Sequence, residues 1–159
     1  MKKKPIDLGA GLTLKLPLAV GTLQWGTTWV DNALINSKGC ISEAEAEAIV
    51  TEFRIDGVSL FDTAEGYGGG TSEKRLGRCI AASDGDDASG GKFPQALLMT
   101  KFLPVPWRLG HWSFERALRA SNKRMGIDCC PIYLLHSPVH WRSIEYWVKS
   151  AAICAKKGL

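Results

Sequence analysis

The 159-residue sequence lacks the segments that mark a membrane-spanning, secreted or metal-binding protein. No apolar stretch approaches the ~20 residues needed to cross a bilayer, and the N-terminus has no apolar signal-peptide core. The five cysteines form no C-x-x-C pair, and with only three histidines no zinc-binding spacing appears. An odd, dispersed set of cysteines is typical of free thiols in a reducing compartment. We therefore expect a cytoplasmic protein with no metal site and no membrane partner.

The sequence also lacks a strong charge imbalance. Its net charge is +4, and no basic stripe with interleaved aromatic residues appears, which makes nucleic acid a poor candidate partner. Hydrophobic residues make up 45% and charged residues 23%, as in ordinary globular proteins. The chain is long enough to bury a core, and we expect residues 1–159 to form one domain.

Strand-like and helix-like segments alternate along the chain. Residues 6–16 resemble a short hairpin, and residues 18–26 (LAVGTLQWG) begin as a first buried strand. Ser42 and Glu45 have the spacing of a capping box, which predicts a helix that ends near Gly57. The remaining expected elements are strands at 57–61 (GVSLF), 96–100 (ALLMT) and 130–135 (CPIYLL), a loop at 83–95, and helices that begin near Ser72, Ser113 and Ser143, the last two ending near Gly126 and Gly158.

This order of elements predicts an α/β fold with a parallel sheet. The β-α alternation occurs four times, and the strands are short, continuous and apolar, as strands buried on both faces must be. An open doubly wound sheet and a (β/α) barrel both fit that pattern. A Rossmann site needs G-x-G-x-x-G after the first strand, but GTLQWG lacks it and the glycine run at 66–70 has the wrong spacing. We therefore predict a (β/α)8 fold of the TIM-barrel type, of which this chain covers roughly the first four β-α units.

Titratable residues follow three successive predicted strands. Asp62 follows GVSLF, Lys101 follows ALLMT and His136 follows CPIYLL, while Tyr67 lies in the glycine-rich loop just beyond Asp62. The C-terminal ends of the strands in a β/α barrel face one shared mouth, where active sites are built. We therefore expect these four side chains to converge.

The types of these four residues indicate proton transfer to a carbonyl oxygen. A tyrosine hydroxyl is a poor acid at neutral pH, because its free pKa is about 10. The ammonium of Lys101 would stabilise the phenolate, and Asp62 would keep that lysine charged and oriented. His136 could donate a hydrogen bond to the carbonyl oxygen and orient the substrate. Tyr67 would then protonate that oxygen as hydride reaches the carbon.

The motif FDTAEGYGGGTSE, followed by MTKF and LLHSP, resembles the aldo-keto reductases over nearly the whole chain. This resemblance implies NADPH-dependent reduction of an aldehyde or ketone, with the four residues above as the catalytic set. It also implies that Thr22 and Leu23, in the first-strand loop, contact NADP(H) together with Asp62. The expected partners are thus a nicotinamide cofactor and a small carbonyl substrate.

Aromatic residues near the expected mouth are candidates for substrate binding. Trp25 lies in the first-strand loop, and Trp107 and Trp112 lie in the loop PVPWRLGHW after the third strand. We predict that Trp25 and Trp107 contact the substrate together with His136. Packing of the rings onto the barrel rim is an equal alternative for Trp107 and Trp112, and Trp29 is similarly ambiguous. The identity of the substrate cannot be predicted from these residues.

The chain departs from the family in length, because a full barrel needs about 250 residues. The other half would carry a Ser-Asn pair under the nicotinamide and the usual phosphate site of barrels. We expect a truncated domain with the proton-transfer residues but without most of the cofactor cradle, and therefore no activity from this chain alone. Its first and fourth strands would be unpaired edges, so we expect self-association or pairing with a complementary half-barrel.

Two other functions fit the same residues. The chain could be a catalytically idle half-barrel that acts only by association. It could also be a Schiff-base lyase, because a lysine at the end of a barrel strand can form an imine with a carbonyl substrate, and Lys101 has that position. An aldolase, however, has no need of Tyr67 beside Lys101.

Overall fold

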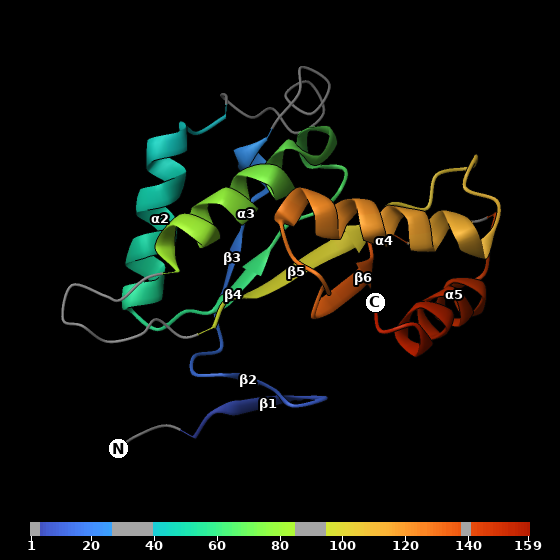
Figure 1. Ribbon diagram of the computed structural model, residues 1–159, viewed down its shortest axis with the longest axis horizontal. Helices are drawn as coiled ribbons and strands as arrows, with labels where there is room; N and C mark the ends of the chain where they lie inside the picture. The colour runs from blue at the N-terminus through green and yellow to red at the C-terminus, as the bar shows by residue number, and fades with distance from the viewer. Residues whose placement is uncertain (1–3, 27–39, 85–94, 138–140) are drawn as a thin grey trace.

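The computed structural model describes residues 4–26, 40–84, 95–137 and 141–159, and these form a parallel sheet with helices against one face (Figure 1). The sheet has the order β3-β4-β5-β6, and all three neighbouring pairs are parallel. Its strands are β3 (Ala19–Gly21), β4 (Leu60–Asp62), β5 (Leu97–Phe102) and β6 (Ile132–Leu135). The helices are α2 (Glu43–Ile55), α3 (Thr71–Ser83), α4 (His111–Met125) and α5 (Ile144–Lys156), and two short 3-10 helices are η1 (Leu23–Trp25) and η2 (Tyr67–Gly70).

An antiparallel hairpin precedes the sheet, as the sequence predicts. It consists of β1 (Ile6–Gly9) and β2 (Leu12–Leu14), and Figure 1 shows it beyond the end of the sheet where the strands begin. Leu14 packs against Leu60 and Leu97 in a small apolar cluster. The hairpin therefore covers the amino ends of the strands on the face opposite the helices and leaves their carboxyl ends open.

The main core lies between the sheet and the helices. Phe61 pairs in register with Leu98, and both side chains point toward the helical layer. Phe102 continues this row and contacts two aromatic rings, that of Phe114 in α4 and that of Trp147 in α5, each at a centroid distance of 4.8 Å. Burial of such side chains stabilises the fold by about 1.5–3 kcal/mol each.

Three predicted helix signals are confirmed. Ser42 and Glu45 form the reciprocal capping box at the start of α2, with the Glu45 carboxylate accepting from the Ser42 N–H at 2.7 Å. Ser143 caps α5 by accepting a hydrogen bond from the N–H of Tyr146. Gly126 ends α4 in the left-handed conformation, with φ of 72°, which a glycine adopts without strain.

Several boundaries differ from the sequence prediction; β4 begins later than predicted and includes Asp62, and β6 begins at Ile132. The predicted cap of α3 is wrong, because α3 begins at Thr71 and the Ser72 hydroxyl points into the protein instead of capping the helix. α4 begins at His111 rather than Ser113, whose hydroxyl donates back to the carbonyl of Gly110 at 2.6 Å. β5 continues past Thr100, so Lys101 lies within the strand. Most of the predicted loop at 83–95 lies outside the described residues.

Within the described residues, β3 and β6 each pair with one neighbour only. Large apolar side chains lie exposed beside these edges: Leu23 is 39% and Phe53 40% exposed on the β3 side, and Leu134 of β6 is 40% exposed. The described helices include none that is long and apolar enough to span a bilayer.

The glycine-rich turn after β4 lies backbone to backbone against the turn after β3. Gly68 has φ of 59° and Gly69 has φ of 60°, values that L side chains rarely adopt. A Cβ on Gly68 would lie 1.2 Å from the carbonyl oxygen of Gly26, whereas a Cβ on Gly69 would meet nothing within 4 Å. Gly68 is therefore required by space as well as by conformation, and Gly69 by conformation alone.

Substitution of these two glycines distinguishes backbone strain from steric overlap with the neighbouring turn. Gly69→Ala should lower the free energy of unfolding by about 1–2 kcal/mol through backbone strain. Gly68→Ala should lower it by roughly 3 kcal/mol or more, because the two turns must also move apart. Urea unfolding of both variants tests this expectation, and equal losses would contradict the close approach of the two turns.

Candidate active site

The register of the sheet places Asp62, Lys101 and His136 on one face. Asp62 pairs with Met99, and Lys101 is two residues further along β5. Lys101 in turn pairs with Leu134, and His136 is two residues beyond that. A shift of two residues keeps a side chain on the same face of a strand. All three therefore point away from the helices, at the carboxyl ends of the strands.

Lys101 is fixed by three acceptors. Its ammonium donates to the Asp62 carboxylate at 2.6 Å, to the carbonyl of Thr63 at 2.8 Å and to the hydroxyl oxygen of Tyr67 at 3.2 Å. Three acceptors match the three N–H donors of an ammonium group. With a side chain only 13% exposed, this cation is held in one position beside the phenol.

Tyr67 reaches the site from the first residue of η2. Its N–H donates to the carbonyl of Ala64 at 3.0 Å, and the turn that follows is the one pressed against Gly26. Its ring meets the His136 ring edge to face, with a centroid distance of 5.5 Å. The predicted convergence of the four side chains is therefore present in the structure.

His136 is held beside Tyr67 by its own backbone, because its N–H donates to the carbonyl of Phe102 at 2.9 Å. Burial lowers the pKa of its imidazole, and the positive charge of Lys101 lowers it further. The ring is therefore neutral at neutral pH, with one nitrogen as donor and the other as acceptor. Its Nδ1 is buried without a hydrogen-bond partner among the described residues.

A buried cluster of three hydroxyls contacts the backbone of Asp62 through Thr22. This cluster was not predicted from the sequence. Thr22 donates from both its hydroxyl and its N–H to the carbonyl of Asp62, at 3.0 and 2.9 Å. The Ser72 hydroxyl lies 2.7 Å from that of Thr22 and 3.0 Å from that of Thr63. All three side chains are buried. The Thr22 hydroxyl is thus used to position Asp62. Leu23, the other residue predicted to contact the cofactor, lies in η1 beside α2.

Two ion pairs hold the surrounding loops and were also missed. The Glu65 carboxylate, 8% exposed, accepts from the N–H of Leu103 at 2.6 Å and forms a two-point contact with the Arg108 guanidinium. It therefore ties the loop that carries Tyr67 to the loop after β5. Behind the sheet, the fully buried Glu73 accepts from Thr100 at 2.7 Å and pairs with Arg124 of α4.

The tryptophans do not gather around these four residues. Trp25 is 4% exposed and belongs to the hydrophobic core, where η1 turns it toward the helical layer. Its predicted role in substrate binding is therefore not supported by its position. Trp107 and Trp112 line a groove beside α4 whose lining includes none of the four convergent residues. Trp29 lies outside the described residues.

The described residues fit the reacting end of a nicotinamide cofactor and its carbonyl substrate. Asp62 is 24% exposed at the open end of the sheet, and the Nδ1 of His136 retains unused hydrogen-bonding capacity. The phenol of Tyr67 and the neutral imidazole of His136 suit a polarised oxygen, while the Lys101 ammonium is already used on its three acceptors. Within the described part of the chain, no group of three His, Cys, Asp or Glu residues is arranged to hold a metal ion.

The electrostatics of His136 can be tested by titration. We expect its imidazole to titrate below the ordinary pKa of about 6.5. Lys101→Met should raise this pKa because it removes a neighbouring positive charge, whereas Lys74→Met on the surface of α3 should leave it unchanged. NMR titration of the ring protons measures both.

The same shift predicts how stability changes with acid. Because the pKa of His136 is lower in the folded state, the unfolded state binds protons first as the pH falls below about 6.5. Its contribution to the free energy of unfolding is therefore retained above that pH and lost as the pH falls through the folded-state pKa. A His136 pKa at or above 6.5 in the unaltered protein would contradict both expectations.

The sequence is similar to known oxidoreductases along most of its length. Residues 17–159 match the Aldo/keto reductase family. Chloroplastic pyridoxal reductase of Arabidopsis thaliana is 33% identical over 135 residues, which are 82% of this chain and 35% of that protein. An aldo-keto reductase of Mycolicibacterium vanbaalenii is 37% identical over 100 residues, or 63% of this chain and 32% of its own.

Solved structures share the fold. A thermostable aldo-keto reductase in complex with the inhibitor epalrestat superposes with a TM-score of 0.70 at 23% identity, covering 99% of this chain and 51% of that one. An aldo-keto reductase from Klebsiella pneumoniae in complex with NADPH gives a TM-score of 0.68 at 23% identity, with 99% and 47% covered. This chain thus spans about half the length of these structures and about a third of the curated relatives, and its four β-α units form half of a TIM-type barrel. With its motifs and its match over residues 17–159, the chain belongs to the aldo/keto reductase family.

Proposed function

We propose that this chain carries the proton-transfer half of an NADPH-dependent reductase, which converts an aldehyde or ketone to an alcohol. The observation that supports this most directly is the Lys101 ammonium fixed between the Asp62 carboxylate and the Tyr67 hydroxyl. Bound NADPH would supply the hydride. The chain's own residues would position the carbonyl and provide the proton.

The hydrogen bonds support Tyr67 as the proton donor. An ammonium has no acceptor, so Lys101 donates to Tyr67 and the hydroxyl hydrogen of Tyr67 is left for another oxygen. The positive charge beside the phenol stabilises the phenolate that forms when the proton leaves. Tyr67 is therefore the general acid in this proposal, and the neutral imidazole of His136 orients the same carbonyl oxygen.

The ion pair with Asp62 also weighs against a Schiff-base lyase. Imine formation requires an uncharged amine. Lys101 donates to three acceptors, one of them a carboxylate 2.6 Å away, and imine formation would have to break these contacts. Borohydride trapping of Lys101 with a keto substrate would overturn the preference for a reductase.

Thr22, Leu23 and Asp62 are proposed to contact NADP(H). The aldo-keto reductase from Klebsiella pneumoniae was solved with NADPH, which supports a nicotinamide cofactor for this family member. The buried Thr22 side chain would act through Asp62, since its hydroxyl donates to the Asp62 carbonyl. The relative named as a pyridoxal reductase supports an aldehyde as the substrate class.

We further propose that the exposed edges at β3 and β6 are covered by a second copy or by a complementary half-barrel. The apolar side chains beside both edges support this association. The five cysteines are free thiols, which favours a reducing compartment such as the cytoplasm, although one relative is named as chloroplastic.

NADPH binding tests the proposed cofactor, with the mass in solution measured alongside. Titration of the purified 159-residue chain should show saturable NADPH fluorescence changes at the mass of a dimer if the half-barrel completes itself. Absence of binding by a loose monomer or an aggregate would instead support an idle half-barrel that needs a complementary half.

Removing one phenol hydroxyl tests the assigned acid. In an assembly of this chain, with itself or with a complementary half, that reduces the substrate, Tyr67→Phe should lower the rate of carbonyl reduction by roughly 10²–10⁴-fold and leave NADPH affinity nearly unchanged, because only the proton donor is lost. Tyr133→Phe is the matched control: its hydroxyl is buried on the helical face of β6 with no hydrogen-bond partner among the described residues. NADPH oxidation with pyridoxal as substrate measures both, and undiminished turnover in Tyr67→Phe would refute the assignment.

A further inference from the structure

A groove of about 290 Å³ runs beside α4, outside the candidate active site. Arg116, Ala117, Ala120 and Arg124 line it. Arg116, Ala120 and Arg124 follow one another at intervals of four residues, and Ala117 lies three before Ala120, which places them on one side of the helix. The two alanines leave room between the longer side chains. Its volume is near the lower end for small-ligand pockets, about 300 Å³, which suits a single ring with one substituent.

Among the described residues that line the groove, one positive charge is uncompensated. Arg108 is paired with Glu65, and Arg124 is paired with Glu73, so these two cations are neutralised by their partners. Arg116 forms no ion pair or hydrogen bond with the described residues. An anion that entered the groove would therefore meet a guanidinium free to bind it in a two-point contact.

Two indole rings lie at the same groove, and both are largely exposed. Trp107 is 74% exposed and Trp112 is 63% exposed. The Trp112 ring lies over Gly110, where a Cβ would come within 2.5 Å of the indole. An exposed pair of large aromatic side chains beside a hollow is typical of a binding site. Their faces can stack against a planar ligand.

We propose that this groove binds a small aromatic anion, a single ring that carries a phosphate or carboxylate group. The ring stacks on Trp107 or Trp112, and the anionic group pairs with Arg116. The site is separate from the proposed reductase chemistry, because its lining residues and the four convergent residues do not overlap. Binding here does not require the cofactor.

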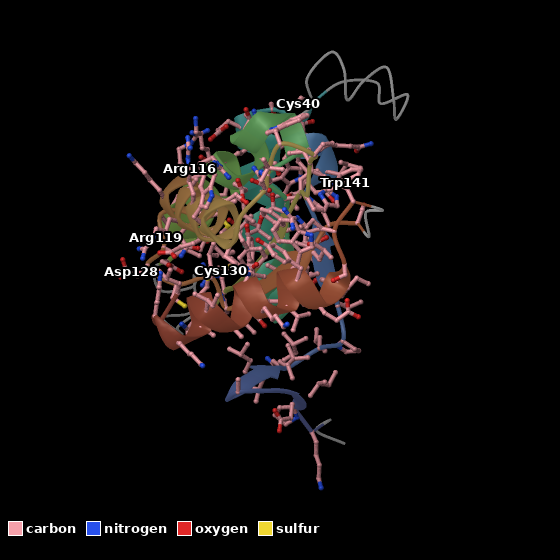
Figure 2. The ribbon with its side chains drawn as sticks, turned by 90° about the vertical axis from the view of Figure 1, so that its right-hand side faces the viewer. Cys40, Arg116, Arg119, Asp128, Cys130 and Trp141 are labelled. Carbon is pink, nitrogen blue, oxygen red and sulfur yellow. The ribbon has the colours of Figure 1, made fainter. Side chains whose placement is uncertain are left out.

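Phenyl phosphate is a suitable probe, followed by NMR of the 15N-labelled chain. Trp107→Phe and Trp112→Phe assign the two indole N–H signals, and both signals should shift saturably as the probe is added. Arg116→Gln should weaken binding about tenfold through loss of a charge-assisted contact. Arg119→Gln is the matched control, since Arg119 also projects from α4 (Figure 2) but pairs with Glu115 and does not line the groove.

Several outcomes would overturn the proposal. They are the absence of saturable shifts, equal weakening in Arg116→Gln and Arg119→Gln, and equal affinity for neutral benzyl alcohol. Equal affinity for inorganic phosphate would show that the indole rings contribute nothing. Tyr67→Phe removes only the hydroxyl of the proposed acid and should bind phenyl phosphate normally, so failure of the proposed reductase activity and failure of this site can be told apart.

Discussion

The position of one ammonium group decides how the functional end of this protein is arranged. A partly buried cation must be compensated, and Lys101 finds its three acceptors between residues 62 and 67. The segment after β4 is thereby held against β5 by charge. Tyr67 depends on this contact and on the turn of glycines behind it, since no regular helix fixes its direction. The contacts that position Tyr67 are therefore the same contacts that stabilise the loop carrying it.

Two charge pairs join the β-α units of β4 and β5. Glu65 joins the loops after β4 and β5 through Arg108, and Glu73 joins α3 to α4 through Arg124. Each carboxylate is nearly or fully excluded from water, so removal of its arginine alone would leave an uncompensated charge. At the amino ends of the strands the hairpin packs on leucines, and an ion pair between the buried Arg54 at the end of α2 and Asp84 after α3 joins the helices there. Both ends of the sheet thus combine charge pairs with other contacts.

The sequence predicts the site best where an ionisable residue directly follows an apolar run. Asp62 and His136 follow apolar runs, and burial of an ionisable group beside a core strand points to a site. The sequence predicts Ser72 as a helix cap because a serine at the start of a helix commonly has that role. In the structure its hydroxyl instead contacts the hydroxyls of Thr22 and Thr63. The sequence predicts Trp25 at the open end of the barrel because it follows the first strand closely. That position does not determine the direction of its ring, which the 3-10 turn directs into the core. Glu65 and Arg108 lie 43 residues apart, and nothing local links them.

The strict alternation along β5 has a consequence for how this protein can diversify. Leu98, Thr100 and Phe102 face the helices, while Leu97, Met99 and Lys101 face the other way. The strand therefore has no position that is free of both the core and the site, and a single inserted residue would exchange the two faces. A change in chain length at this end of the sheet can therefore occur without reversing the strand only in the loops.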